Sequence, residues 1–424
     1  MKKSLVLKTF IRARYFHGFR DRKRLERYQQ RQVAKQIKFM KQNSPYFKQY
    51  SDKSFAELPY MNKQIMMDNF DKMNTARISK DEALKLAIDS EKSREFSEKL
   101  NGYSVGLSSG TSGHRGVFVL SDDEIATWVG GMMAKMLPKR KIFETKVAFF
   151  LRADNNLYES SNSRALKFEF FDILKPMIDN INKLQEFQPT ILVAPPSVLL
   201  ILADAAKTGK LKINPVRIIS VAEVLTETDE KEIKRAFGQK VIYQVYQCTE
   251  GFLGYTCEYG SLHINEDVIL MEKEYIDDER FTPVITDFVR KTQPIIKYRL
   301  NDILVEDKRT CKCGTSMLRL KRIEGRMDDV FEFEGLEGGK VQVFPDFIAR
   351  VIVYVPNIKN YRVVQKTAKR VIIYLDNICK QNQKKVKREF ENLAKKMKFK
   401  MPVLEYKKYE TDFSRKMKRV ERLK

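Results

Sequence analysis

The chain has 424 residues, and its 80 Lys and Arg exceed its 55 Asp and Glu, which gives a formal net charge of +25. This length suggests about two or three domains, a hydrophobic fraction of 43% excludes wholesale disorder, and five cysteines are too few for a disulfide framework. Since no stretch approaches the ~18–20 apolar residues of a membrane span, and the apolar run before Lys8 is too short for a signal peptide, we expect a cytoplasmic protein.

Helices dominate the first hundred residues, and alternating strands and helices follow. Residues 20–42 predict a basic helix with Leu25, Val33 and Ile37 at helical spacing, and residues 62–100 predict further short helices. From Tyr103 onward, short apolar runs alternate with helical segments, as in a layered α/β body. The candidate strands are residues 147–151, 190–194, 217–221 and 241–245, and the candidate helices are residues 121–137, 163–186, 197–208 and 226–237.

The last third of the chain has a different pattern. Residues 262–306 alternate as a β-meander does, and beyond Gly325 we expect strands near 361–366 and 370–375, a helix near 383–397 and a basic tail. The predicted fold class is therefore α/β, with a large layered α/β N-terminal domain, a β-meander subdomain and a small α+β C-terminal domain. The expected divisions are a helical region at 1–100, the core of the large domain at 101–327 and the C-terminal domain at 328–424.

The excess positive charge is concentrated at the two ends of the chain. Residues 1–50 hold 15 Lys and Arg and two acids, a net of +13, and residues 381–424 hold 16 against six, a net of +10. The remaining residues 51–380 carry only +2. We expect no specific nucleic acid partner. The basic N-terminus suggests peripheral contact with an anionic membrane or an acidic partner, and a solvated helix face is the alternative.

A loop rich in Gly and hydroxyl groups follows the helical region. Backbone N–H groups of such a loop can turn inward and hold a polyphosphate, although a plain turn is the alternative for the loop seen alone. It is not a Walker loop, because no G-K-[ST] follows at the required spacing. The loop residues are Ser108, Ser109, Gly110, Thr111, Ser112 and Gly113.

Three further motifs follow this loop in order: Y-Q-C-T-E at 246–250, Y-R-L-N-D at 298–302 and G-R-M-D-D at 325–329. With S-S-G-T-S-G they resemble the ordered signature of the adenylate-forming enzymes, the superfamily of acyl-CoA synthetases, nonribosomal-peptide adenylation domains and luciferases. The chain is most similar to the phenylacetate–coenzyme A ligase branch, which also contains synthetases that adenylylate a deazaflavin coenzyme. Branch-like features include N-S-P-Y-F at 43–47, L-H-I-N-E-D at 262–267 and K-M-K-R-V at 416–420.

The resemblance implies a two-step reaction with ATP. A carboxylate attacks the α-phosphate to give acyl-AMP and pyrophosphate, and an acceptor such as coenzyme A then takes the acyl group. Positioned donors, cations and Mg²⁺ would assist this chemistry. By resemblance the 108–113 loop holds the β- and γ-phosphates, and Glu250 binds Mg²⁺. The other implied nucleotide-site residues are Thr249, Asp302 and Arg326 around the phosphates and ribose, and Ala222, Glu223 and Tyr246 in the adenine pocket.

The resemblance also assigns roles within a mobile C-terminal domain. Lys416 would neutralise the α-phosphate during adenylation, a task that suits a point charge on a flexible stem. Only the alignment of K-M-K-R-V with the branch pattern G-K-A-K-R-V selects Lys416 over Lys418, and Arg415 stands in place of the Gly. Asp328 would be the hinge about which the domain rotates between the two half-reactions. Seen singly, Glu250 is equally explained as a first-turn helix acid and Asp302 as a turn residue.

Four other residues form a candidate metal site. Cys257 and His263 are spaced C-x5-H, and Cys311 and Cys313 form a C-x-C. Three thiolates and one imidazole are a complete tetrahedral set for structural Zn²⁺, and reduced surface thiols beside a loop His are the alternative. The phenylacetate-ligase branch carries a similar His and C-x-C at these places.

The sequence departs from the branch in its substrate regions. Residues 331–340 are longer and more acidic than the stretch that lines the coenzyme A tunnel in relatives, and residues 151–158 are polar. We therefore expect an ATP-dependent ligase that activates a polar or aromatic carboxylic acid and transfers the acyl group to coenzyme A or another acceptor. The alternatives are a nucleotidyltransferase that places AMP on a hydroxyl, and a catalytically degenerate basic protein at nucleic acids or membrane surfaces.

Overall fold

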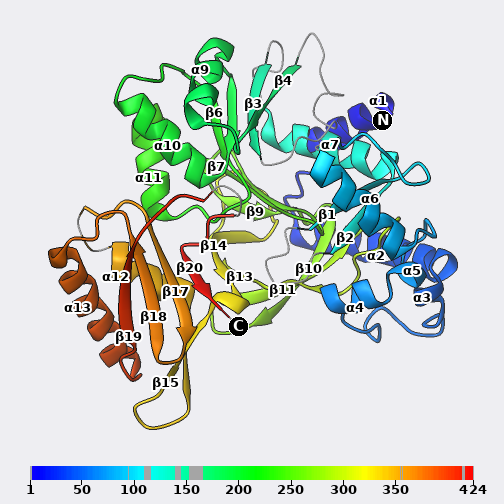
Figure 1. Ribbon diagram of the computed structural model, residues 1–424. Helices are drawn as coiled ribbons and strands as arrows, with labels where there is room; N and C mark the ends of the chain where they lie inside the picture. The colour runs from blue at the N-terminus through cyan, green and yellow to red at the C-terminus, as the bar shows by residue number, and fades with distance from the viewer. Residues whose placement is uncertain are drawn as a thin grey trace. The chain divides into compact units, whose positions relative to one another are not determined.

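The computed structural model describes residues 2–93, 95–108, 116–138, 145–151, 166–353, 355, 357–412 and 416–423. The chain divides into a large unit, Met1–Leu300 with Val305–Arg322, and a small unit, Asn301–Leu304 with Ile323–Lys424. Both are mixed α/β, and this class agrees with the expectation from the sequence (Figure 1). None of the described helices is long and apolar enough to cross a membrane.

The N-terminal part of the large unit is helical, as predicted. The predicted helix 20–42 is confirmed as α2 (Arg22–Asn43), which begins where Asp21 accepts a hydrogen bond from the N–H of Arg24 at 2.9 Å. The short helices expected within 62–100 are also confirmed. The elements of this part are α1 (Lys3–Ile11), η1 (Arg12–Phe16), α2, α3 (Pro45–Lys48), α4 (Lys63–Asp68), α5 (Phe70–Met73), α6 (Lys80–Ser93) and the hairpin of β1 (Ser104–Leu107) and β2 (Val117–Leu120).

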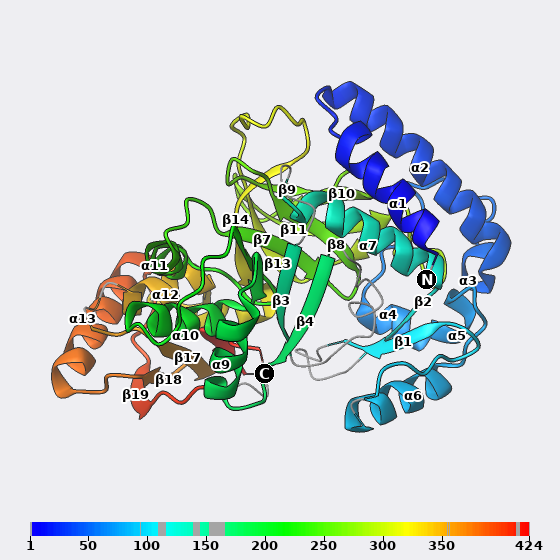
Figure 2. The ribbon, with the colours of Figure 1, turned by 90° about the horizontal axis from the view of Figure 1, so that it is seen from above.

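A parallel array of five strands forms one arm of the main sheet. Its order is β4-β3-β5-β6-β7, and all neighbours within it are parallel. Helices cover both faces, with α7 on one side and α9 to α11 on the other (Figures 1 and 2). The elements are β3 (Thr145–Leu151), β4 (Leu166–Asp172), β5 (Ile191–Ala194), β6 (Arg217–Ser220), β7 (Tyr243–Cys248), α7 (Asp122–Met136), α9 (Met177–Phe187), α10 (Pro196–Lys207) and α11 (Glu227–Phe237).

All four strands predicted for this region are confirmed, as are three of the four helices. The remaining helix prediction is wrong in its first half. The segment 163–186 was expected to be helical throughout, but residues 166–172 form β4, which pairs in parallel with β3. Its Phe168, Phe170 and Phe171 favour a pleated strand, and Phe171 stacks on Phe150 of β3 with 4.6 Å between ring centroids. Residues 163–165 lie outside the described part of the chain.

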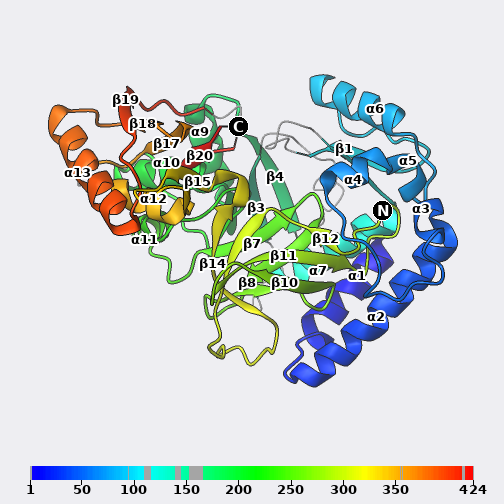
Figure 3. The ribbon, with the colours of Figure 1, turned by 90° about the horizontal axis from the view of Figure 1, so that it is seen from below.

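The other arm of the sheet contains the predicted meander. Among the described residues the whole sheet has 12 strands in the order β10-β11-β13-β14-β9-β8-β7-β6-β5-β3-β4, with β12 beside β11 (Figure 3). β8 returns antiparallel to β7, so the parallel arm ends at β7. The strands of this arm are β8 (Gly251–Thr256), β9 (Leu262–Ile264), β10 (Ile269–Tyr275), β11 (Arg280–Asp287), β12 (Tyr298–Arg299), β13 (Asp302–Glu306) and β14 (Arg319–Arg326).

The small unit has its own core. Its four-stranded sheet, β19-β18-β17-β20, packs with two helices around buried residues that include Phe331, Phe333, Phe390 and Phe399. Strands 361–366 and 370–375 and helix 383–397 are confirmed, whereas the basic tail was not expected to form strands. The elements are η2 (Met327–Asp329), β15 (Phe331–Glu334), β16 (Lys340–Val343), α12 (Pro345–Val353), β17 (Tyr361–Thr367), β18 (Arg370–Leu375), α13 (Lys380–Met397), β19 (Val403–Lys408) and β20 (Val420–Arg422).

Helix α7 is the platform on which α1 lies. A capping box starts it, because the Ser121 side chain accepts from the N–H of Glu124 and the Glu124 side chain accepts from the N–H of Ser121. Gly130 allows α1 to approach closely, since a Cβ at this position would lie 2.5 Å from the carbonyl oxygen of Val6. The neighbouring Gly131 faces open space within 4 Å.

This pair of glycines gives a matched test of the packing of α1. Gly131→Ala should stabilise the protein by up to about 1 kcal/mol, because Ala is the better helix former. Gly130→Ala should instead lose about 1–3 kcal/mol, because the methyl group meets backbone of α1. Urea unfolding and the rate of trypsin cleavage within residues 1–16 measure the two effects. Equal behaviour of the two variants would contradict the close α1–α7 contact.

Candidate active site

The turn between β7 and β8 places two predicted residues at the edge where the parallel strands end. Thr249 and Glu250 form this turn, and Ala222 and Glu223 follow the neighbouring strand β6. In open α/β sheets, ligands bind outside the carboxyl ends of the parallel strands. The position at which the parallel arm gives way to the antiparallel arm is therefore a physically reasonable place for a ligand site.

A small cavity, open to solvent, lies at this turn within the large unit. It contains three predicted residues, Ser108, Thr249 and Glu250. Cationic, amide and phenol side chains to which the sequence analysis assigned no role also line it. These are Lys63, Arg290, Gln293 and Tyr298.

Glu250 is held by a phenol. The hydroxyl of Tyr298 donates a hydrogen bond to Glu250 Oε1 at 3.0 Å. Burial and the neighbouring carboxylate of Glu250 raise the pKa of Tyr298 well above its usual value, so the phenol stays protonated and continues to donate. The carboxylate therefore has a defined orientation at the cavity. Tyr298 belongs to the Y-R-L-N-D motif, which is the sequence signal that could have identified it.

The two ends of the Gly-rich loop are fastened together. The N–H of Ser108 donates to the carbonyl of Gly116 at 2.7 Å, and the N–H of Gly116 donates to Ser108 Oγ at 2.8 Å. The predicted residues Ser109, Gly110, Thr111, Ser112 and Gly113 lie outside the described part of the chain. A Cβ at Gly116 would lie 2.9 Å from Lys63 Cε, so the absence of a side chain here admits Lys63 to the cavity.

Lys63 is placed by the start of helix α4. Asn62 caps this helix by accepting from the N–H of Ile65 at 2.9 Å, which makes Lys63 the first helical residue. The sequence contained a usable signal, since Asn followed by a helical segment is typical of an N-cap.

Arg290 is buried at the cavity, and hydrogen bonds from its guanidinium and from its backbone N–H hold it in place. Its guanidinium donates to the carbonyl of Thr249 at 3.0 Å, and its own N–H donates to Asp287 at 3.0 Å. Burial raises the pKa of Asp287 to about 6, although Arg290 opposes the shift. Glu124 fixes the following residues, because it accepts from the N–H groups of residues 291 and 292 at 2.6 and 2.8 Å. No local pattern reveals this arrangement, since Glu124 is distant in sequence.

The residues predicted for an adenine pocket are near the end of β6 and within β7. Ala222 has a positive φ of 67°, and Glu223 accepts from the N–H of Ser197 at 3.1 Å at the start of α10. Tyr246 is buried in β7. Of the described residues that line the cavity, none is Ala222, Glu223 or Tyr246.

The remaining nucleotide residues belong to the small unit. Arg326 Nε lies 3.5 Å from Asp302 Oδ1, so the two predicted residues meet. Asn301 donates to Asp328, and the N–H of Met327 donates to the carbonyl of Asn301 at 2.9 Å. The predicted hinge residue Asp328 is thus bonded to Asn301, which directly precedes Asp302 and β13.

Lys418, the alternative to Lys416 in the tail motif, pairs with an acidic residue of the small unit. Lys418 Nζ lies 3.0 Å from Asp329 Oδ1. Burial raises the pKa of Asp329, and Lys418 partly offsets this effect. Lys418 therefore has a structural partner within the small unit. The selection of Lys416 as the catalytic lysine remains a prediction.

The structure brings the four predicted zinc residues together in the large unit. The ligand atoms of Cys257, His263, Cys311 and Cys313 all lie within 4.8 Å of one another. Cys257 Sγ is 3.7 Å from Cys311 Sγ, and Cys313 Sγ is 3.5 Å from His263 Nε2. Tetrahedral Zn–S and Zn–N bonds would separate ligand atoms by about 3.5–3.8 Å. The donor set and its spacing therefore fit Zn²⁺.

Two further contacts suit the cluster to a metal. His263 Nδ1 lies 3.3 Å from the carbonyl oxygen of Met317, and an Nδ1–H donated to this carbonyl leaves Nε2 as the ligand atom. Burial opposes ionisation of Cys311, but hydrogen bonding to Ser261 and the nearby backbone lowers its pKa overall. The thiolate is the form that binds a metal.

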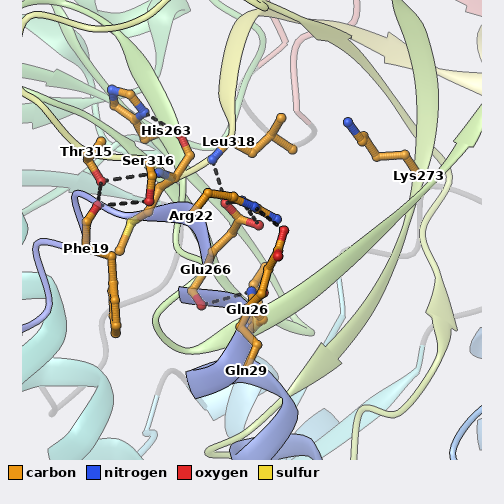
Figure 4. A network of polar contacts seen from close by, with 12 residues as sticks. Phe19, Arg22, Glu26, Gln29, His263, Glu266, Lys273, Thr315, Ser316 and Leu318 are labelled. Atoms are coloured by element: carbon orange, nitrogen blue, oxygen red, sulfur yellow. Dashed lines mark hydrogen bonds and ion pairs between the residues drawn. The ribbon is translucent and has the colours of Figure 1, made fainter. Parts of the chain in front are cut away.

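Basic N-terminal residues contact the buried, adjacent acids Glu266 and Asp267, and Figure 4 shows Arg22 at Glu266. Arg22 donates to both carboxylate oxygens of Glu266 at 2.9 and 2.7 Å, and Glu266 also accepts from the N–H of Leu318 at 2.6 Å. Asp267 pairs with Lys135 at 2.6 Å and with His17 at 3.4 Å. Part of the basic N-terminus therefore has partners inside the large unit.

No protein-family model matches the chain. A phenylacetate–coenzyme A ligase from Thermus thermophilus is 25% identical over 200 residues, which are 43% of each chain. An indoleacetate–lysine synthetase from Pseudomonas savastanoi is 30% identical over 134 residues, 31% of this chain and 33% of that protein. The matches thus span less than half of either relative.

Among solved structures, 2-hydroxyisobutyryl-CoA ligase in its postadenylation state matches with a TM-score of 0.67 and 14% identity. This match covers 93% of this chain and 88% of the ligase. The likeness is one of fold.

Asp267→Asn should destabilise the large unit by about 3–5 kcal/mol, because it leaves the buried ammonium of Lys135 without its carboxylate. Asp123→Asn, which breaks an exposed pair with Lys2, should cost about 1 kcal/mol or less. Urea unfolding measures both, and similar losses would contradict the role of the buried pair.

The free energy of unfolding of the large unit should decrease at acidic pH, because Asp267 then loses its charge. Although burial opposes the shift, Lys135 and His17 lower the pKa of Asp267 from 3.8 to about 2. This contribution to stability is complete above about pH 4 and disappears as the pH falls toward 2.

Proposed function

We propose that this chain is an ATP-dependent ligase of the adenylate-forming superfamily, a proposal that its fold and its sequence matches support. It would activate a carboxylic acid as acyl-AMP, release pyrophosphate and pass the acyl group to a thiol or an amine. One observation carries the proposal: Ser108, Thr249 and Glu250 meet at a cavity that also contains Lys63 and Arg290.

The groups that line the cavity have the chemistry that the triphosphate of ATP requires. Negative charge develops on phosphate oxygens as pyrophosphate leaves, so the site needs cations and N–H donors. Lys63 and Arg290 supply positive charge, and Ser108 begins the Gly-rich loop. Glu250 offers the hard carboxylate oxygen that Mg²⁺ prefers. Mg²⁺ bound there would neutralise phosphate charge, while Tyr298 keeps the carboxylate oriented.

The other nucleotide contacts are proposed from the motif order. Asp302 and Arg326 would bind the ribose and the α-phosphate, with Ala222, Glu223 and Tyr246 beside the adenine. Lys416 would approach the α-phosphate as the adenylate forms, and Asp328 would act as the hinge.

The names of the two sequence relatives narrow the substrates to test. One name specifies phenylacetate with coenzyme A, and the other specifies indoleacetate with lysine. Both acids are arylacetic acids, so we propose an aromatic acid as the substrate class. Coenzyme A and a primary amine are the two acceptor types to compare.

We also propose that Cys257, His263, Cys311 and Cys313 bind a structural Zn²⁺. The four ligand atoms would close the coordination sphere, which leaves no open position for catalysis. Zn²⁺ would join the β8–β9 connection to the segment between β13 and β14.

The decisive experiment is ATP–pyrophosphate exchange across a panel of arylacetic, aliphatic and amino acids. Wild-type protein should support exchange with at least one acid. Glu250→Gln and Lys416→Ala should each reduce the rate by about 100-fold or more, because each removes a group that stabilises charge at the reacting phosphates.

Matched controls are Glu227→Gln, in the first turn of α11, and Lys408→Ala, at the end of β19. Both should exchange at wild-type rates. The ligase proposal fails if no acid supports exchange while AMP becomes attached to an alcohol or phenol.

Zinc content tests the metal proposal separately. Wild-type protein purified without chelator should hold about one zinc per chain. Cys311→Ser and Cys313→Ser should lose it, whereas Cys379→Ser, which alters an exposed cysteine, should retain it. Unchanged zinc in the first two variants would overturn the assignment.

A further inference from the structure

The N-terminal helical segment exposes large apolar side chains to solvent. Leu7 is 58% exposed, Ile11 40%, Tyr15 67% and Phe16 70%. These four residues lie within ten positions on α1 and η1. A soluble protein normally exposes such side chains singly, and a contiguous group marks an interaction site.

The exposed apolar residues share one side of the segment with cations. Lys3, Leu7, Ile11 and Tyr15 are spaced four residues apart, and helical residues at this spacing are neighbours. Lys8, Arg12 and Phe16 form an adjacent line with the same spacing. We call these seven residues the α1 outer face.

Packing on α7 prevents this face from turning inward. The opposite side of α1 approaches Gly130 so closely that a Cβ there would lie 2.9 Å from Thr9 Cβ. Arg14 fixes the end of the segment, because its guanidinium donates to the carbonyls of Ala134, Leu137 and Pro138 at 2.7, 2.8 and 2.9 Å. The side of the segment that faces solvent is therefore determined.

Helix α2 adds further exposed positive charge to the N-terminal part of the large unit. Basic residues on α2 recur three or four positions apart, and each is exposed: Arg24, Arg27, Arg31, Lys35 and Lys38. Within the described part of the chain, no acidic side chain forms an ion pair with Arg31, Lys35 or Lys38.

We propose that the α1 outer face docks on the surface of a bilayer that contains anionic phospholipids. Aromatic and aliphatic side chains interleaved with Lys and Arg fit the interface, where the apolar groups enter the acyl boundary and the cations meet headgroup phosphates. A second copy of the chain would bring like charges together across the contact. Nucleic acid would engage the cations but would leave Leu7 and Ile11 without an apolar partner.

This proposal goes beyond the ligase function, because it places the chain at a membrane whichever reaction it catalyses. The α1 outer face lies on α1 and η1, and neither element contributes a residue to the cavity at Glu250.

Co-sedimentation of the full chain with vesicles tests it. Binding should be strong with vesicles of phosphatidylcholine and phosphatidylglycerol at low salt, weak with phosphatidylcholine alone, and reduced by added salt. The double variant Tyr15→Gln/Phe16→Gln should bind about tenfold more weakly, because two exposed aromatic groups no longer enter the interface. Lys3→Gln/Lys8→Gln should also bind about tenfold more weakly.

Each variant has a matched control. Leu174→Gln/Tyr259→Gln removes two comparably exposed apolar groups elsewhere, and Lys384→Gln/Lys385→Gln removes two exposed charges from α13. Both should bind as wild type does. Circular dichroism and thermal unfolding confirm that all four variants fold.

Three results would overturn the proposal. One is no preference for phosphatidylglycerol at low salt. Another is unchanged binding of the Tyr15/Phe16 variant, which would leave a purely electrostatic contact. The last is a wild-type dimer by light scattering that this variant dissociates, without vesicle binding, which would assign the face to a second copy.

Discussion

Two adjacent carboxylates, Glu266 and Asp267, lie almost fully buried, each 1% exposed, and the large unit is organised around their neutralisation. Burying two like charges is unfavourable unless cations and donors satisfy them. Arg22 from the start of α2 and Lys135 from the last turn of α7 supply the opposite charges. The Gln29 side chain donates hydrogen bonds to the backbone carbonyls of Glu266 and Ile269. Two helices that are far apart in the sequence are thereby fixed to one turn of the sheet.

This arrangement changes the interpretation of the basic N-terminus. The sequence alone offered a docking face or a solvated helix for its net +13. The structure divides that charge into two groups. Arg14, His17 and Arg22 are used internally, at the end of α7 and at the acidic pair. Arg12 on the α1 outer face also donates to His17, whereas Lys3 and Lys8 form no ion pair with any described residue and are available to an external partner.

The sequence predicted elements whose signal is local. Apolar runs identified β5 and β6, and helical spacing identified α2, because each pattern lies within one segment. β4 was mistaken for helix, because its alternation of charged and aromatic residues is short, at 167–170, and is broken at Phe171. The same limit applies to the site. The motif identified Glu250, but Arg290 depends on Glu124, which holds the loop from a distant helix, and no short window of sequence contains both partners.

The cysteine cluster and the acidic pair constrain the same hairpin from different sides. Glu250 directly precedes β8, Cys257 directly follows it, and His263 lies in β9, three residues before Glu266. A strand whose far end is fixed at two points transmits that restraint along its backbone to its near end. The hydroxyl of Tyr298 orients Glu250 at the cavity, and the proposed Zn²⁺ would add a restraint at the opposite end of β8. Glu250 thus lies directly before the β8–β9 hairpin, and the buried acids Glu266 and Asp267 lie just after it.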